Sequence, residues 1–139
     1  MGILAKKVSK LIGRPPAAIL REIDLEIQEG DFLALTGRSG SGKSSLLYLL
    51  SSLDLASEGA IEIDKQNVAK MSAEDLCAFR NAKMGFVFQF HYLLSELNAL
   101  ENVLFPARKN KLWEKKKKYA QELLSWFGLK DKLLRFPCQ

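Results

Sequence analysis

Residues 37–44 read Gly-Arg-Ser-Gly-Ser-Gly-Lys-Ser, a string that fits the GxxxxGK[ST] pattern of phosphate-binding loops. The apolar run Phe32-Leu33-Ala34-Leu35 precedes this loop, and the leucine-rich stretch 43–52 follows it. A buried strand, a glycine-rich loop and then a helix form the context in which such a loop binds phosphate. A glycine-rich turn without a ligand would leave that context unexplained, so the string favours a P-loop.

The residue types in this loop suit the phosphates of a nucleotide. Backbone N–H groups can surround phosphate oxygens only where side chains stay away, and Gly37, Gly40 and Gly42 allow that approach. The helix that follows adds unpaired N–H groups and the positive end of its dipole. Lys43 supplies a full positive charge, and the hydroxyl of Ser44 is of the type that ligates Mg²⁺.

Hydrophobic periodicity predicts strands and helices that alternate along the chain. Strands are expected at residues 22–27, 31–36, 59–64 and 84–88, and the runs 31–36 and 84–88 read as fully buried strands. Helices are expected at residues 43–52, from Ser72, from Asn98 until Pro106 ends or kinks it, and at 112–127 before Gly128. This order indicates the α/β class, with an antiparallel piece beside a buried parallel core.

The helix expected at residues 112–127 has its apolar residues along one stripe. These residues are Leu112, Trp113, Ala120, Leu123, Leu124 and Phe127.

Length and composition are those of one soluble domain. The chain has 139 residues, a net charge of +5 and two cysteines, Cys77 and Cys138, whose spacing fits no metal site. No apolar h-region of a signal peptide follows Met1, and no window approaches the ~18 apolar residues of a membrane span. We therefore expect a cytoplasmic protein.

A polar and aromatic segment follows the apolar run at 84–88. Gln89 could hold Mg²⁺ or orient a water through its amide oxygen, but spacing alone favours a glutamine that faces solvent. His91, the single histidine, has no adjacent nucleophile or carboxylate, so contact with a neighbour is favoured over catalysis. The apolar residues Phe90, Tyr92, Leu93 and Leu94 either pack beneath the domain's own surface or dock a partner helix.

Three strings together resemble the nucleotide-binding domain of ABC transporters. The loop 37–45 resembles its Walker A form, Gly85-Phe-Val-Phe-Gln89 resembles its Q-loop, and Ala99-Leu-Glu-Asn-Val103 is similar to the helix that follows. The resemblance extends from about Val8 to Gln139. Within the family, residues 88–94 look most like the ATPases of lipoprotein-releasing systems, with macrolide exporters and FtsE-type ATPases as close relatives.

This resemblance implies a P-loop NTPase fold with a partial RecA-like core and, at residues 111–135, part of a helical subdomain. It implies that ATP and Mg²⁺ bind, with Ser44 and Gln89 on the metal and Gln89 sensing the γ-phosphate. The implied cofactor-binding set is Gly37, Arg38, Ser39, Gly40, Ser41, Gly42, Lys43, Ser44, Ser45 and Gln89.

The resemblance also implies partners and a location. Residues 90–97 would touch the coupling helix of an integral membrane subunit, and full ATPase subunits would close as a homodimer. The expected function is that of the energy-coupling subunit of an ABC transporter that releases or exports lipoproteins from the inner membrane. The subunit itself is expected in the cytoplasm, peripheral on the cytoplasmic face of that membrane. Two alternatives stay open: a non-catalytic nucleotide-binding remnant of such a subunit, and an unrelated P-loop kinase, which the second and third strings disfavour.

Residues 1–139 also depart from the family pattern. An adenine-stacking aromatic is replaced by Leu11-Ile12, and the signature motif, expected after Phe136-Pro137-Cys138-Gln139, does not occur. A Walker B pattern and a switch histidine do not occur either. We therefore expect one ATP-binding domain truncated before the signature motif. Because hydrolysis needs a positioned water and groups specific to the transition state, this chain alone should turn over little or no ATP.

A basic segment comprises Arg108, Lys109, Lys111 and Lys115 to Lys118. A solvated helix face explains it most simply. Contact with anionic lipid head groups is the second interpretation. Nucleic-acid binding ranks last, because no RNA-binding motif accompanies the segment.

Overall fold

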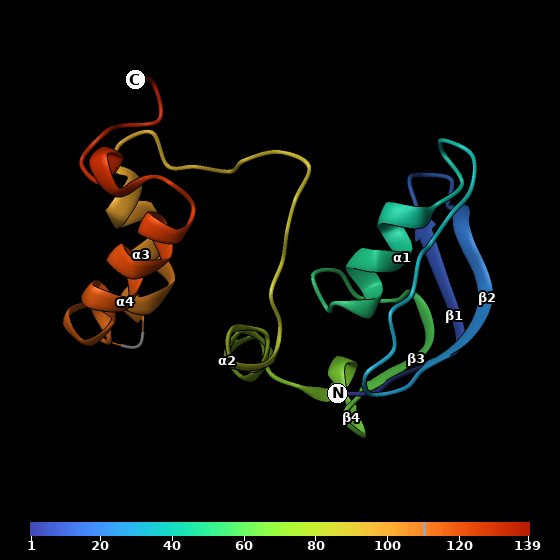
Figure 1. Cartoon of the computed structure of the whole chain (residues 1–139). Coiled ribbons are helices and arrows are strands. Elements are labelled where there is room, and N and C mark those ends of the chain that lie inside the picture. The colour runs from blue at the N-terminus through green and yellow to red at the C-terminus, as the bar shows by residue number, and fades with distance from the viewer. Residues whose placement is uncertain (110) are drawn as a thin grey trace. The chain divides into compact units, whose positions relative to one another are not determined.

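The computed structural model describes residues 1–109 and 111–139, and the chain forms two compact units, residues 1–85 and 86–139 (Figure 1). The first unit contains β1 (Ile3–Ile12), β2 (Ala17–Ile27), α1 (Lys43–Leu50), β3 (Glu58–Ile63), β4 (Gln66–Asn67), the 3₁₀ turn η1 (Val68–Lys70) and α2 (Ala73–Lys83). The second contains α3 (Ala99–Lys109), α4 (Trp113–Trp126) and the 3₁₀ turn η2 (Lys130–Lys132). Among the residues described, no helix has the length and apolar character needed to cross a membrane.

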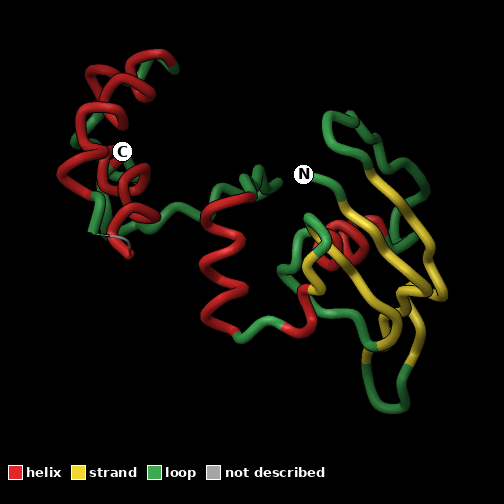
Figure 2. The backbone as a smooth tube through the Cα atoms, turned by 90° about the horizontal axis from the view of Figure 1, so that it is seen from below, coloured by secondary structure: helices red, strands yellow, loops and turns green. Residues whose placement is uncertain are grey.

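The first unit is built on a four-stranded sheet in the order β2-β1-β3-β4, with antiparallel pairing throughout (Figure 2). The core joins Ala5 and Val8 of β1 and Ile61 and Ile63 of β3 to helices α1 and α2. The helices contribute Leu46, Leu49 and Leu50 from α1 and Leu76 from α2. The predicted antiparallel piece is therefore confirmed.

Strand β1 was not predicted, because a bulge breaks its alternation. Lys7 has a φ of +47°, and the pairing of β1 shifts register against both of its neighbours around this point. As a result Val8 and Ser9 are both buried, although they are consecutive. A bulge inserts one extra residue into a strand, so the period of two that identifies a strand in a sequence is lost.

The strands expected at 31–36 and 84–88 are not present, and both predictions are wrong for this structure. Both runs are irregular, with Phe32 99% exposed and Val87 102% exposed. A hydrophobic run becomes a strand only when another strand pairs with its N–H and C=O groups. No other segment among the described residues pairs with either run.

The predicted helix starts are confirmed in detail. The Ser72 hydroxyl caps α2 by accepting a 3.1 Å hydrogen bond from the N–H of Asp75. At α3, the N–H of Glu101 donates to Asn98 Oδ1 at 2.9 Å and the N–H of Asn98 donates to Glu101 Oε2 at 3.0 Å, which is a capping box. Pro106 does not end α3, which continues to Lys109.

The second unit packs α3 against α4 around Leu100, Leu104, Ala120 and Leu124. The expected stripe on α4 is only partly correct, because Phe127 is 79% exposed. Gly128 follows α4 with a φ of +73°, as predicted for the residue after a helix end. The N–H groups of Ala99 and Leu100 donate to carbonyls of the C-terminal segment, which ties that segment to the start of α3.

An ion pair beside the sheet gives the first unit a predictable response to acid. Lys10 Nζ lies 2.7 Å from both carboxylate oxygens of Asp54, and the hydrogen bond from Lys10 lowers the pKa of Asp54 below its usual 3.8. A lowered folded-state pKa stabilises the fold above the unfolded pKa and loses that contribution as pH falls through the folded value. We expect Asp54→Asn to reduce the free energy of unfolding at pH 7 by about 0.2–1 kcal/mol, because the pair is partly exposed. In urea titrations the difference from the unmodified chain should shrink below about pH 4. A difference that is the same in acid would contradict this role.

Candidate functional site

The predicted phosphate loop joins the sheet unit to α1. Gly42 is the N-cap residue of α1 with a φ of +89°, and Gly40 and Gly37 have φ values of +78° and +150°. Residues with a Cβ rarely adopt these conformations. The N–H of Ser41 donates to the carbonyl of Arg38 at 3.3 Å and closes the turn between them. The glycines therefore set the curvature of this loop.

Strand β2 positions the C-terminal end of the loop. A Cβ at Gly42 would lie 2.9 Å from Leu20 Cδ2 and 3.3 Å from the carbonyl oxygen of Ile19. Leu20 is itself buried in the core of the sheet unit. The bare backbone at Gly42 thus rests directly on the sheet, and this contact fixes where α1 begins.

The ammonium group of Lys43 lies against the inside of the loop. Its Nζ donates to the carbonyl oxygens of Gly37 at 2.9 Å and Arg38 at 2.7 Å, and lies 3.5 Å from Ser41 Oγ. The loop therefore holds a full positive charge at its centre. Since a glycine N-cap has no side-chain oxygen, the first N–H groups of α1 are left to bond an incoming anion.

The groups around the loop are of the kinds that bind a phosphate group. A Cβ at Gly37 would lie 3.1 Å from Ser41 Oγ and 3.9 Å from Lys43 Cδ, so any side chain there would enter the cradle. Ser44 is exposed on the first turn of α1, where its hydroxyl is open to a metal ion, and Ser45 follows it half-buried. The fit rests on the donor set: bare backbone, an ammonium group, helix N–H groups and hydroxyls.

Gln89 is not brought to this loop by the described contacts. It lies exposed in an irregular segment of the second unit, whereas residues 37–45 belong to the first. Its predicted role as a metal ligand and γ-phosphate sensor stays a prediction. The predicted single domain over residues 1–139 likewise stays a prediction.

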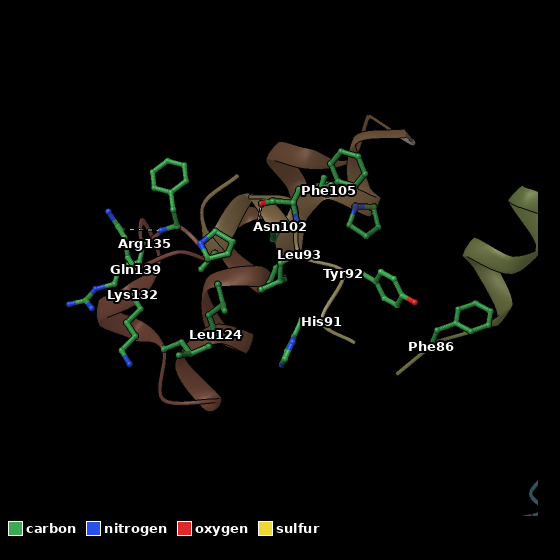
Figure 3. Close-up of a pocket in the computed structure, with 17 residues that line it drawn as sticks. Phe86, His91, Tyr92, Leu93, Asn102, Phe105, Leu124, Lys132, Arg135 and Gln139 are labelled. Carbon is green, nitrogen blue, oxygen red and sulfur yellow. Dashed lines mark hydrogen bonds between the residues drawn. The ribbon is translucent and has the colours of Figure 1, made fainter. Parts of the chain in front are cut away.

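The second unit has a largely apolar groove with a volume of about 790 Å³. Figure 3 shows His91, Tyr92 and Leu93 of the segment before α3 at this groove, together with Asn102 and Phe105 of α3 and Leu124 of α4. Tyr92 packs edge-on against Phe88, with ring centroids 5.1 Å apart. Four residues of the segment 90–97 line this groove: His91, Tyr92, Leu93 and Leu94.

Asn102 holds the segment before α3 in place, a role that the sequence analysis missed. Its Nδ2 lies within hydrogen-bonding distance of the carbonyls of Leu94, Leu97 and Asn98, at 3.1, 2.8 and 3.1 Å. Its Oδ1 accepts from the N–H of Leu94 at 2.9 Å. The available signal was its position four residues after the N-cap Asn98, one helical turn into α3, where its side chain can reach back to the incoming chain.

Comparison with known proteins agrees with this geometry. A family model described as "ABC transporter" matches residues 20–137. The lipoprotein-releasing system ATP-binding protein LolD of Leptospira interrogans is 49% identical over 132 residues, which cover 95% of this chain and 55% of that protein. LolD of Aquifex aeolicus is 47% identical over 120 residues, covering 86% of this chain and 54% of that protein.

Among solved structures, the dimeric ATP-binding cassette MJ0796, in a post-hydrolysis state bound to ADP and Pi, matches with a TM-score of 0.86 and 33% identity. The match covers 99% of this chain and 62% of that one. The predicted P-loop NTPase fold class is therefore confirmed. The chain spans about half the length of the curated relatives it matches. Because the family model covers most of its residues, this chain belongs to the ABC transporter family.

Proposed function

We propose that this chain binds ATP with Mg²⁺ through residues 37–45, as part of the energy-coupling subunit of an ABC transporter. The observation that carries the proposal is the position of Lys43 Nζ, which donates to the Gly37 and Arg38 carbonyls at the inside of a loop where a Cβ at Gly37 would lie 3.1 Å from Ser41 Oγ. The relatives of this chain that are named as lipoprotein-releasing system ATP-binding proteins support lipoprotein release as the process that the transporter carries out.

Each loop residue has a distinct part in this proposal. Lys43 would exchange its bonds to the loop carbonyls for bonds to the outer phosphates, and the N–H groups of α1 would add further donors. The Ser44 hydroxyl would ligate Mg²⁺, and the amide oxygen of Gln89 would add a second protein ligand. Mg²⁺, when bound, neutralises charge on the phosphates.

Hydrolysis is proposed to be weak in residues 1–139. The groups described around the loop would bind phosphate in the ground state, and only interactions that strengthen in the transition state accelerate the reaction. A chain that binds nucleotide without turnover would fit the alternative of a non-catalytic remnant. Because both hypotheses expect little turnover by residues 1–139, they are separated by the intact mass of the native protein, which exceeds that of residues 1–139 if these are part of a longer subunit.

Nucleotide titration tests the proposal directly. The chain is titrated with a fluorescent ATP analogue with Mg²⁺ and again with excess chelator, and Ser44→Ala is titrated in parallel. Binding that Mg²⁺ strengthens in the unmodified chain, and strengthens much less in Ser44→Ala, is the expected result. Failure to bind nucleotide while the chain retains its helical circular dichroism would refute the proposal. Steady phosphate release that disappears in Lys43→Ala would refute the expectation of weak turnover.

We further propose that residues 90–97 dock a helix of an integral membrane subunit, which would place the ATPase at the cytoplasmic face of the inner membrane. The apolar groove supports this, because Tyr92, Leu93 and Leu94 are exposed along it and Asn102 fixes their backbone. Relatives solved as dimers support a homodimer of the full subunit.

A photo-crosslinking residue at position 92 tests the docking segment in living cells. Adducts with an integral membrane protein are expected, and the same residue at Glu29, exposed in the first unit, is the control. Equal adducts from both positions would show only proximity to the membrane and would count against a docking role for residues 90–97.

A further inference from the structure

The net charge of the chain is confined to one of its two units. Residues 1–85 carry eleven basic and eleven acidic side chains, whereas residues 86–139 carry ten basic and five acidic ones. The whole net charge of +5 therefore belongs to the second unit. Such a distribution favours an anionic partner on that unit rather than a general solubility role.

Helix α4 concentrates this charge at its exposed surface. Lys115, Lys116, Lys117 and Lys118 are all exposed, while Ala120 and Leu124 of the same helix are buried in the core that α4 forms with α3. The rest of the second unit therefore does not cover these lysines.

Aromatic side chains share that open surface. Lys115, Tyr119, Glu122 and Trp126 follow one another at spacings of four, three and four residues, so they lie along one face of α4. Tyr119 is 49% exposed and Trp126 is 74% exposed. Lys116 Nζ lies 5.6 Å from the Tyr119 ring centre. Two exposed aromatic side chains therefore lie beside lysines on this helix.

Lysines beside tryptophan and tyrosine are typical of surfaces that rest at a membrane interface. Their aromatic rings lie at head-group level, and lysine chains reach anionic head groups while their methylenes stay over the apolar boundary. The charge comes from lysine, and the bidentate geometry that selects individual phosphates belongs to arginine. Diffuse attraction to a charged surface suits this composition better than recognition of a folded nucleic acid.

We propose that the lysine face of α4, defined as Lys115 and Lys118 with Tyr119 and Trp126, docks directly on the surface of a bilayer that contains anionic phospholipid. The lysines hold the head groups and Trp126 enters the head-group boundary, while Glu114 and Glu122 on the same helix weaken the attraction. This proposal does not depend on nucleotide binding, because the lysine face belongs to the second unit and the loop at residues 37–45 belongs to the first.

The fluorescence of Trp126 tests this proposal in the full chain. The chain has two tryptophans, so the variant Trp113→Phe reports on Trp126 alone. It is mixed with vesicles of phosphatidylglycerol and phosphatidylcholine, or of phosphatidylcholine alone. A blue shift of Trp126 emission, and its quenching by brominated lipid, are expected only with phosphatidylglycerol and should decline at high salt.

Charge variants identify the face responsible. Lys115→Gln with Lys118→Gln should weaken partitioning about thirtyfold, because each lysine near such a surface contributes roughly fivefold. The matched control, Lys6→Gln with Lys70→Gln, removes the same charge from exposed positions of the first unit and should change partitioning less than about twofold.

Three outcomes would overturn the proposal. One is equal binding to vesicles with and without phosphatidylglycerol, and another is an equal loss in the control pair, which would indicate net charge alone. The third is tight binding of single-stranded RNA by the same lysines while brominated lipid leaves Trp126 unquenched, which would assign this face to nucleic acid.

Discussion

Replacing Lys43 with alanine is expected to weaken the binding of Mg²⁺–ATP by about ten- to a hundredfold. The ammonium is held at the inside of the loop by the carbonyls of Gly37 and Arg38, where the outer phosphates would take its hydrogen bonds. A hydrogen bond between charged groups contributes about 1.5–3 kcal/mol, and 1.4 kcal/mol corresponds to a factor of ten in affinity. Equilibrium titration with a fluorescent ATP analogue measures the change.

Two matched variants separate this role from general effects of charge. Lys70→Ala removes an exposed lysine from the same unit and should leave affinity within about twofold. Lys43→Arg keeps the charge, but a planar guanidinium does not reproduce the compact contact of Nζ with two carbonyls, so it should also bind weakly. Unchanged affinity in Lys43→Ala would show that nucleotide does not use this loop.

The conformation of the loop at residues 37–45 was predictable because its information is local. Its glycines, its lysine and the start of α1 lie within a few consecutive residues, and the φ values at Gly37, Gly40 and Gly42 are those that glycine alone adopts easily. The helix caps at Ser72 and Asn98 were predictable for the same reason: the capping residue and the group it bonds are three positions apart.

The errors came from features that depend on distant parts of the chain. The runs at 31–36 and 84–88 have the composition of buried strands, but pairing decides whether a strand forms, and composition does not report a partner. Strand β1 shows the reverse case, because its partners exist while the bulge at Lys7 hides its alternation. Asn102 was missed because its four bonds fall on a segment without regular structure.

Gly59 faces the bulge of β1, and replacing it with alanine is expected to cause the largest loss of stability of any substitution considered. Gly59 has a φ of +84°, and a Cβ there would collide with the backbone carbonyl oxygens of Lys6 and Lys7. Backbone atoms cannot move aside as a flexible side chain can. The strain of a positive φ and the clash together should cost about 3–5 kcal/mol. Because total stability is only about 5–15 kcal/mol, the sheet unit should melt at least about 12 °C lower.

Gly30→Ala is the control that isolates the clash from the backbone strain. Gly30 has a nearly identical φ of +90°, yet among the residues described no atom lies within 4 Å of a Cβ placed there. Its substitution should therefore cost only the strain, about 1–2 kcal/mol. Thermal unfolding followed by circular dichroism gives both values under one condition. If Gly59→Ala melts at the same temperature as Gly30→Ala, then β3 does not approach the bulge of β1 as closely as the structure places it. A lower temperature for Gly59→Ala alone would mean that the pairing of β1 with β3 requires a glycine at this position.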